Sequence, residues 1–273
     1  MEADKRLDWN SLLQQAIMMP GNVGNIYSRF YNYSYLNTVL LMSQGVIEPV
    51  ATYKRWQSLN RQVVKGSKAK TIIRPIVIEK KDDEGEVQSR RLSFKAVRCI
   101  FGLSETVGQD LPPAEVPGWD LQQALDQLDV KQVPFRELDG NIQGYSVDRE
   151  FAINPVAVHP VKTTFHELGH IVLGHTAGSA AAEYRSHRGI KEFQAESVAY
   201  LAMNELELMT PEQASSSRGY IQGWLQRQTP AEADIRPVFM ATDKILRAGR
   251  SNVIDLYPNG TPTDQWDPAA ESF

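Results

Sequence analysis

Two pairs of side chains place the strongest constraint on how this chain can fold. The segment TTFHELGHIVLGH, residues 163–175, places His166 and His170 four residues apart with Glu167 between them. Residues four apart on an α-helix differ by only about 40° in rotation, so both imidazoles leave one face and can meet at one ion. Zinc bound in this way needs a third protein ligand, because its fourth position is left for water or substrate. A second element must therefore pack against this helix.

The best source of that third ligand is EFQAE, residues 192–196, within a helix predicted over residues 191–208. His175 is a poor ligand, because on a continuous helix it lies about 140° from His170. Glu192 and Glu196 are four residues apart and share a face. One carboxylate can bind the metal while the other accepts the free N–H of a ligand histidine and fixes its tautomer.

Glu167 has the position expected of a general base. It lies about 100° around the helix from His166, off the metal but within reach of a water. HELGH followed some twenty residues later by Glu-x-x-Ala-Glu also resembles the gluzincin pattern of zinc peptidases. That resemblance implies a His₂Glu site in which Glu192 is the third zinc ligand and Glu196 orients a ligand histidine.

Three alternatives stay open. The helix can carry two histidines without a metal, Glu196 can replace Glu192 as the ligand, or a bound metal can support no peptide hydrolysis. Four further residues can stabilise an oxyanion, although each is more often a surface or packing residue: His159, His187, Tyr145 and Tyr184.

The first half of the chain combines helices with a β-hairpin. Residues 8–19, 34–44 and 52–64 have helical patterns, with Thr52 as the N-cap of the third. Residues 70–79 and 89–103 are rich in β-branched and aromatic residues and predict two strands, joined by an exposed turn at 80–87. This succession predicts an α+β fold.

The segment GQDLPPAEVPGWD, residues 108–120, has three prolines and two glycines and predicts a linker. We expect four parts: an N-terminal domain over 1–108, a linker over 109–118, a metallopeptidase-like domain over 119–257 and a loose tail over 258–273. In the third part, short strands are predicted at 131–138, 142–147 and 150–154. The HELGH helix begins at Pro160, capping boxes at Thr210 and Thr229 open two later helices, and Pro237 is expected to kink or break the last.

Charge is distributed unevenly along the chain. The formal net charge is −4, yet residues 1–110 hold 16 Lys and Arg against 11 acidic residues. Such asymmetry indicates an anionic partner for the basic part. One cysteine in the whole chain, no long apolar segment and a polar start predict a soluble cytoplasmic protein without disulfides.

Residues 49–78 contain seven Lys and Arg and no acid, with aromatic residues among them. Cations that alternate with aromatic rings suit single-stranded nucleic acid, because phosphates pair with the cations and bases stack on the rings. The alternative is that the rings belong to the core and the cations to a solvated face. The candidate contacts are Tyr53, Lys54, Arg55, Trp56, Arg61, Lys65, Lys68, Lys70 and Arg74.

The segments YSYLNTVLLMSQ, ATYKRWQSLNRQVVKGSKAKTIIRPI and FKAVRCIFGLSET are similar to the N-terminal domain of the ArdC antirestriction family, which mobile elements carry. The resemblance implies a domain that binds single-stranded DNA joined to a zinc metallopeptidase-like domain. HELGHIVLGH and EFQAESVAYLAM are closer to metallopeptidases of the ImmA/IrrE type.

We therefore expect a DNA-associated zinc metallopeptidase that acts on an unidentified protein. Two alternatives are a DNA-coating shield with a non-catalytic metal site and a protease that cleaves one specific repressor.

Overall fold

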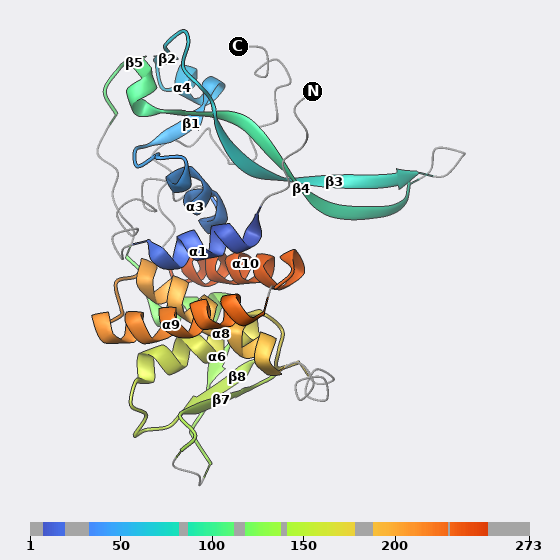
Figure 1. Cartoon of the computed structure of the whole chain (residues 1–273), viewed down its shortest axis with the longest axis vertical. Helices are drawn as coiled ribbons and strands as arrows, with labels where there is room; N and C mark the ends of the chain where they lie inside the picture. The colour runs from blue at the N-terminus through green and yellow to red at the C-terminus, as the bar shows by residue number, and fades with distance from the viewer. Residues whose placement is uncertain are drawn as a thin grey trace. The chain divides into compact units, whose positions relative to one another are not determined.

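The computed structural model describes residues 8–19, 33–81, 87–111, 118–137, 141–177, 188–228 and 230–250. Within these residues the fold is α+β, as predicted, with helices and three small sheets (Figure 1). Contacts divide the chain into unit 1, residues 1–36 with 115–256, and unit 2, residues 37–114 with 257–273. No helix in the described ranges has the length and apolarity that crossing a bilayer requires.

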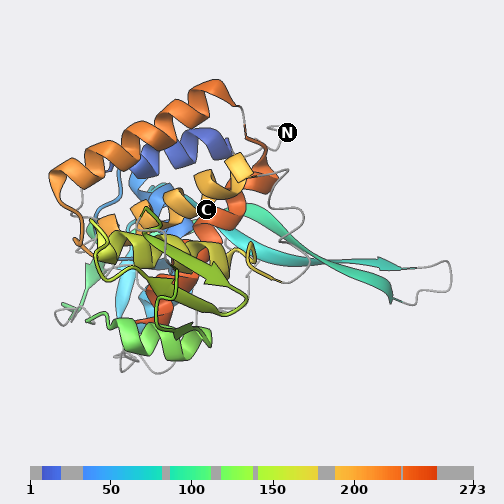
Figure 2. The ribbon, with the colours of Figure 1, turned by 90° about the horizontal axis from the view of Figure 1, so that it is seen from below.

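This division differs from the expected N-terminal domain over residues 1–108, because the first helix belongs to unit 1. Helix α1 (Trp9–Met18) buries Leu12, Leu13 and Ile17 against α8, α9 and α10 (Figures 1 and 2). The Trp9 ring lies 6.3 Å from that of Phe239 in α10. Apolar burial therefore attaches this helix to the C-terminal part of the chain. Residues 112–117 of the expected linker and the expected tail lie outside the described residues.

Helix α8 (Arg188–Glu205) is the centre of unit 1. It contacts α6 (Pro160–Val172), α9 (Pro211–Arg227), α10 (Glu232–Ala248) and α1. Every residue from 193 to 205 is buried, so neighbouring elements cover this helix on every side. The buried apolar residues of α8 are Phe193, Ala195, Val198, Ala199, Tyr200, Leu201, Ala202 and Met203.

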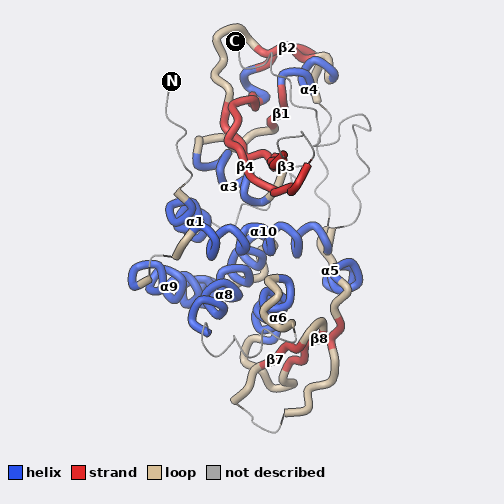
Figure 3. Tube along the Cα trace, turned by 90° about the vertical axis from the view of Figure 1, so that its right-hand side faces the viewer, coloured by secondary structure: helices blue, strands red, loops and turns tan. Residues whose placement is uncertain are grey.

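A three-stranded sheet covers the other side of α6 (Figure 3). It follows α5 (Leu121–Leu128) and has the order β6 (Lys131–Gln132), β8 (Glu150–Ile153), β7 (Gly144–Val147). Strand β6 pairs parallel to β8, and β7 pairs antiparallel to it. A Cβ on Gly144 would lie 2.7 Å from Thr163 Cγ2, so glycine allows β7 to approach α6 closely.

Unit 2 contains most of α3 (Tyr35–Ser43) and two sheets. Strands β1 (Val50–Thr52), β4 (Val87–Gly102) and β3 (Lys70–Lys81) form one sheet in that order. The antiparallel β3–β4 pair is a long twisted ribbon (Figure 1). Strands β2 (Arg61–Val63) and β5 (Thr106–Gly108) form the second sheet, and the 3₁₀ turn Leu103–Glu105 precedes β5.

Two amide side chains, one in α3 and one directly after its end, complete the outer edge of β3. Asn37 donates to the Ile73 carbonyl at 2.9 Å and accepts from the Ile73 N–H at 2.7 Å. Gln44, seven residues later on the same face, forms the same pair of bonds with Thr71, each 2.8 Å long. The edge strand thus has partners for backbone groups that would otherwise need water or another strand.

Some predicted elements end differently. Thr52 caps α4 (Tyr53–Ser58) as expected, but the helix stops before Asn60, whose φ is 56°, and residues 61–63 pair with β5 instead. The predicted strand 131–138 is only two residues long, in keeping with the missing N–H of Pro134.

The two predicted capping boxes have different outcomes. Thr210 and Gln213 form the expected box at the start of α9. Helix α10 begins instead at Glu232, where the Asp234 carboxylate accepts the Ala231 N–H, and Thr229 lies outside the described residues. The helix continues through Pro237 without a break.

Candidate metal centre

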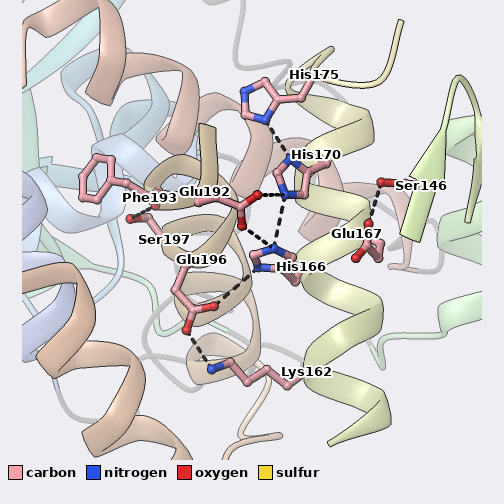
Figure 4. Close-up of polar contacts among 10 residues, drawn as sticks. All are labelled: Ser146, Lys162, His166, Glu167, His170, His175, Glu192, Phe193, Glu196 and Ser197. Carbon is pink, nitrogen blue, oxygen red and sulfur yellow. Dashed lines mark hydrogen bonds and ion pairs between the residues drawn. The ribbon is translucent and has the colours of Figure 1, made fainter. Parts of the chain in front are cut away.

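The structure brings His166, His170 and Glu192 together between α6 and α8 (Figure 4). The Nε2 atoms of the two histidines are 3.2 Å apart, and Glu192 oxygens lie 3.3 Å from His166 Nε2 and 3.7 Å from His170 Nε2. Ligands on a tetrahedral ion with bonds of about 2.0–2.1 Å are about 3.4 Å apart. The donor atoms of these three residues therefore have about the separation that a small tetrahedral ion requires.

Gly169 explains how two helices come close enough to share a ligand set. A Cβ at this position would lie 3.1 Å from the Ala195 carbonyl oxygen and 3.2 Å from Ala195 Cα. Because Gly169 has no side chain and Ala195 a small one, the backbones of α6 and α8 meet directly between the ligand residues. The glycine of HELGH thus sets the spacing of the site.

Glu196 contacts the His166 ring at the nitrogen that faces away from the ligand position. Its Oε2 lies 3.4 Å from His166 Nδ1, and Lys162 Nζ lies 2.8 Å from its Oε1 (Figure 4). Burial alone would raise the pKa of Glu196, but hydrogen bonds from His166 and Lys162 outweigh it and lower the pKa to about 2. An ionised Glu196 accepts the Nδ1–H of His166 and leaves Nε2 facing the ligand position.

In the metal-free protein His166 holds a proton strongly. Burial alone would lower its pKa, but hydrogen bonds to Glu192 and Glu196 raise the pKa to about 9. The site therefore accumulates negative charge that a cation must balance, which is the property expected of a metal centre.

His175 contacts His170 on the side away from the ligand position. The two Nδ1 atoms are 3.0 Å apart, and His175 Nε2 lies 3.1 Å from Gln194 Oε1. Burial and the neighbouring His170 lower the pKa of His175 to about 4, so its ring is neutral. The sequence pattern excluded His175 as a ligand and indicated no other role for it or for Gln194.

Glu167 points away from the ligands, toward β7 (Figure 4). Its Oε2 accepts a hydrogen bond from Ser146 Oγ at 2.5 Å. Its side chain lines the same cleft of about 800 Å³ as the two ligand histidines and Glu192. The arrangement places a carboxylate beside the metal position without making it a ligand, as a general base requires. Ser146 is a second functional candidate that the sequence pattern did not indicate.

Of the four candidates for oxyanion stabilisation, His159 and Tyr145 line this cleft. His159 Nδ1 lies 3.0 Å from Gln213 Nε2, so its Nδ1 accepts and its Nε2 carries the proton. His187 and Tyr184 lie outside the described residues.

Trp56 is not available to nucleic acid. The side chain is 1% exposed, and its Nε1 donates to the Phe101 carbonyl at 2.9 Å. The prediction that its ring stacks on a base is wrong, because the ring fills a small core. That core also includes Ala51, Val63 and Phe101.

Two of the predicted cationic contacts have partners within unit 2. Arg61 Nε donates to Thr106 Oγ1 at 2.8 Å, and Lys70 forms an ion pair with Glu105. These two side chains hold β2 and β3 to the segment around β5, so their prediction as phosphate contacts is not supported by the structure. The other candidates are more accessible: Lys54, Lys65 and Lys68 are exposed, and Tyr53, Arg55 and Arg74 are half-buried.

Comparison with known proteins relates the N-terminal part of the chain to one family model. Residues 2–99 match the family model for the N-terminal domain of anti-restriction factor ArdC, so this part is ArdC-like. The chain is similar to the metal-free crystal structure of the antirestriction ArdC protein from the R388 plasmid, with 20% identity over 80% of this chain and 82% of that chain and a TM-score of 0.47. The chain is also similar to the Mn(II)-bound crystal structure of that protein, with 19% identity over 80% of this chain and 86% of that chain and a TM-score of 0.40. No curated protein matches the chain.

Proposed function

We propose that this ArdC-like chain is a metal-dependent peptide hydrolase that also binds single-stranded DNA and acts in antirestriction in the cytoplasm. The observation that carries the proposal is the convergence of two imidazoles and a carboxylate beside the non-ligand Glu167 in one cleft. A structural metal site would have no need of an open cleft or of an acid such as Glu167 that is not a ligand.

Zinc is the ion we propose for this site. A His₂Glu set with tetrahedral spacing and one open position is the usual catalytic zinc site. Zinc also binds nitrogen ligands more tightly than manganese does. The residues that would hold it are His166, His170 and Glu192, with Glu196 as the partner of His166.

The ion would polarise a peptide carbonyl and make a water more acidic. Glu167 accepts the proton from that water and then passes it to the leaving amine. Ser146 fixes the Glu167 carboxylate through its 2.5 Å hydrogen bond. Tyr145 and His159 are placed in the cleft to contact the substrate carbonyl.

Strand β7 offers a place for an extended peptide. It is at the edge of its sheet, and its residues from Gly144 to Val147 line the cleft. No strand in the described parts of the chain pairs with its outer edge. A peptide added there would pass the metal position as an extra antiparallel or parallel strand.

DNA binding is proposed for the exposed cations of unit 2. Lys54, Lys65 and Lys68 are exposed, as are Lys95 and Arg98 of β4, which sequence reasoning did not single out. Tyr53 is half-buried, packs against the small core around Trp56 and accepts a hydrogen bond from Gln62. The match of residues 2–99 to the ArdC N-terminal domain supports this assignment. Because both units belong to one chain, we propose that bound DNA brings a protein substrate to the cleft.

The test compares wild type with Glu167→Gln in four measurements. We expect the variant to bind zinc and an oligonucleotide as wild type does, but to lose hydrolysis of an unstructured protein and protection of incoming DNA. Protection by a variant that hydrolyses nothing would contradict the proposal and favour the DNA-coating shield. Hydrolysis that proceeds equally with and without single-stranded DNA would contradict recruitment. Cleavage of a single repressor would favour the third alternative.

A further inference from the structure

A chain of hydrogen bonds leads from His170 into the interior of unit 1. His170 contacts His175, His175 contacts Gln194 of α8, and Gln194 Nε2 donates to the Asp234 carbonyl of α10 at 2.7 Å. The exposed fractions of His170, His175 and Gln194 are 5%, 7% and 8%. Water therefore has little access to these groups, and each polar atom must find its partner within the chain.

The Asp234 carbonyl determines the direction of every bond in this chain. A carbonyl only accepts, so the Gln194 amide turns its Nε2 toward Asp234 and its Oε1 toward His175. An amide oxygen also only accepts, so His175 carries its proton on Nε2. The Nδ1 of a neutral His175 then has a lone pair and accepts the Nδ1–H of His170. His170 is left with a bare Nε2 directed at Glu192 and His166.

The local backbone explains why His175 can reach His170. Gly174 has φ 77°, the Gly174 N–H bonds the Ile171 carbonyl at 3.0 Å, and the His175 N–H bonds the His170 carbonyl at 2.9 Å. These bonds form a Schellman motif, which ends α6 and returns the chain over its last turn. The His175 ring lies 5.2 Å from that of His170, where the motif usually has an apolar contact.

We propose that His175 and Gln194 are positioning residues that fix the metal-binding tautomer of His170. This positioning role rests on the proposed metal site, but it does not depend on peptide hydrolysis. Glu196 has the corresponding role for His166, so each ligand histidine has its own partner. The two partners differ in charge: Glu196 is an anion, whereas His175 and Gln194 form a neutral relay that ends at a backbone carbonyl.

The direct test is long-range ¹H–¹⁵N correlation of the histidine side chains in the metal-free full chain near neutral pH. We expect His170 to be protonated on Nδ1 and His175 on Nε2. A His170 protonated on Nε2, or a His175 protonated on Nδ1, would overturn the assignment. This measurement needs neither metal nor substrate, so failure of the hydrolase proposal would leave it unaffected.

Zinc affinity, measured by competition with a chromophoric chelator, tests the consequence. His175→Leu keeps similar bulk but offers no acceptor, and we expect its zinc affinity to fall by about 10–100-fold. His175→Asn places an amide oxygen near the former Nδ1 and should restore most of the affinity. Equal affinity in wild type and the leucine variant would exclude a positioning role.

Gln194→Leu is the second variant if His175→Leu does not fold. It leaves His175 in place but removes the acceptor of its Nε2–H. We expect a mixture of His175 tautomers and a smaller loss of zinc affinity than in His175→Leu. A single unchanged tautomer in this variant would show that the Asp234 carbonyl does not direct the chain. Far-ultraviolet circular dichroism and the melting temperature of each metal-free variant verify the fold.

Discussion

Glu167 has three rotatable bonds in its side chain, and Ser146 restricts them. The 2.5 Å bond from Ser146 Oγ joins the proposed general base to the edge strand of the sheet. A carboxylate that turns away from the cleft cannot accept the proton of the attacking water. We expect Ser146→Ala to lower kcat about 10-fold with little change in KM. Zinc content and melting temperature should stay at the wild-type values, and an unchanged kcat would contradict the assignment.

His166 gives the metal-free protein a definite pH dependence. Its pKa of about 9 exceeds the ordinary 6.5, so the stabilisation from its proton is fully present below pH 6.5 and is lost as the pH rises through 9. Between these two values the proton must leave before the metal enters. Titration calorimetry in buffers of different ionisation enthalpy should show about one proton released per zinc bound near pH 7.5.

Glu196→Gln provides the matched variant for that experiment. It removes one of the three carboxylates that raise the pKa of His166, so fewer protons should be released at the same pH. If wild type and variant release the same number of protons per zinc bound, Glu196 does not hold the His166 proton. The melting temperature of the metal-free variant controls for loss of fold.

At the scale of elements, the close packing of α6 on α8 depends on Gly169. Valine is a better helix former than glycine, so propensity alone predicts a gain in stability for Gly169→Val. We expect the opposite, a loss of about 1–3 kcal/mol, because the added groups meet the backbone of Ala195. Zinc affinity should fall about 10-fold or more, because Glu192 moves away from the two histidines.

Gly219 is the control for this substitution. It is an exposed residue of α9, and nothing lies within 4 Å of a Cβ at that position. Gly219→Val should therefore leave zinc affinity unchanged and raise stability slightly, measured by urea unfolding. If the two valine variants behave alike, the contact between the helices does not set the site.

Asn37 of α3 and Gln44, directly after its end, offer a second comparison. Both complete the edge of β3 with the same pair of bonds, but Asn37 is 8% exposed whereas the bonds of Gln44 are exposed. We expect Asn37→Leu to cost about 2–4 kcal/mol, because Ile73 is left with an unpaired buried N–H and C=O. Gln44→Leu should cost less than about 1 kcal/mol, because water replaces it. Urea unfolding and exchange of the Ile73 amide distinguish the two results, and equal costs would refute this account.

The elements were predictable where one local signal decides them. The apolar period predicts α1 and α8, and Thr52 and Thr210 are correct N-caps. Predictions failed where the chain turns within a helical pattern. The helix expected over 52–64 ends at Ser58, because β5, more than forty residues later, pairs with residues 61–63. The rejection of His175 as a ligand agrees with the structure, but its contact with His170 was missed, since a helical wheel assumes that α6 continues past Gly174.

Across the molecule, the sequence indicated which residue types suit each site but not which of those residues are exposed. The spacing of HExxH and the later glutamates is local to two helices, so it specified which residues could meet. Exposure of Trp56 or Arg61 depends on strands that come together from distant parts of the chain, and composition carries no information about it. The same limit applies to α1, whose apolar face did not reveal that it packs with α10 instead of unit 2.

The proposed DNA contacts of unit 2 include exposed lysines, and this makes the binding surface testable. Lys65 and Lys68 are exposed, whereas Lys70 is paired with Glu105. We expect Lys65→Gln with Lys68→Gln to weaken binding of a mixed-sequence single strand, and to lower the slope of log affinity against log salt by roughly one to two. The measurement is fluorescence anisotropy of a labelled oligonucleotide at several salt concentrations.

The control makes the same change of charge on unit 1, where Lys131 and Arg136 are also exposed. Lys131→Gln with Arg136→Gln lowers the net charge equally, so an effect of total charge alone would appear in both double variants. Binding through unit 2 predicts a changed slope only for the Lys65 and Lys68 variant. Chelation of the metal should leave that slope unchanged, because the ligands and these lysines belong to different units. Equal slopes for all three proteins would move the DNA surface away from Lys65 and Lys68.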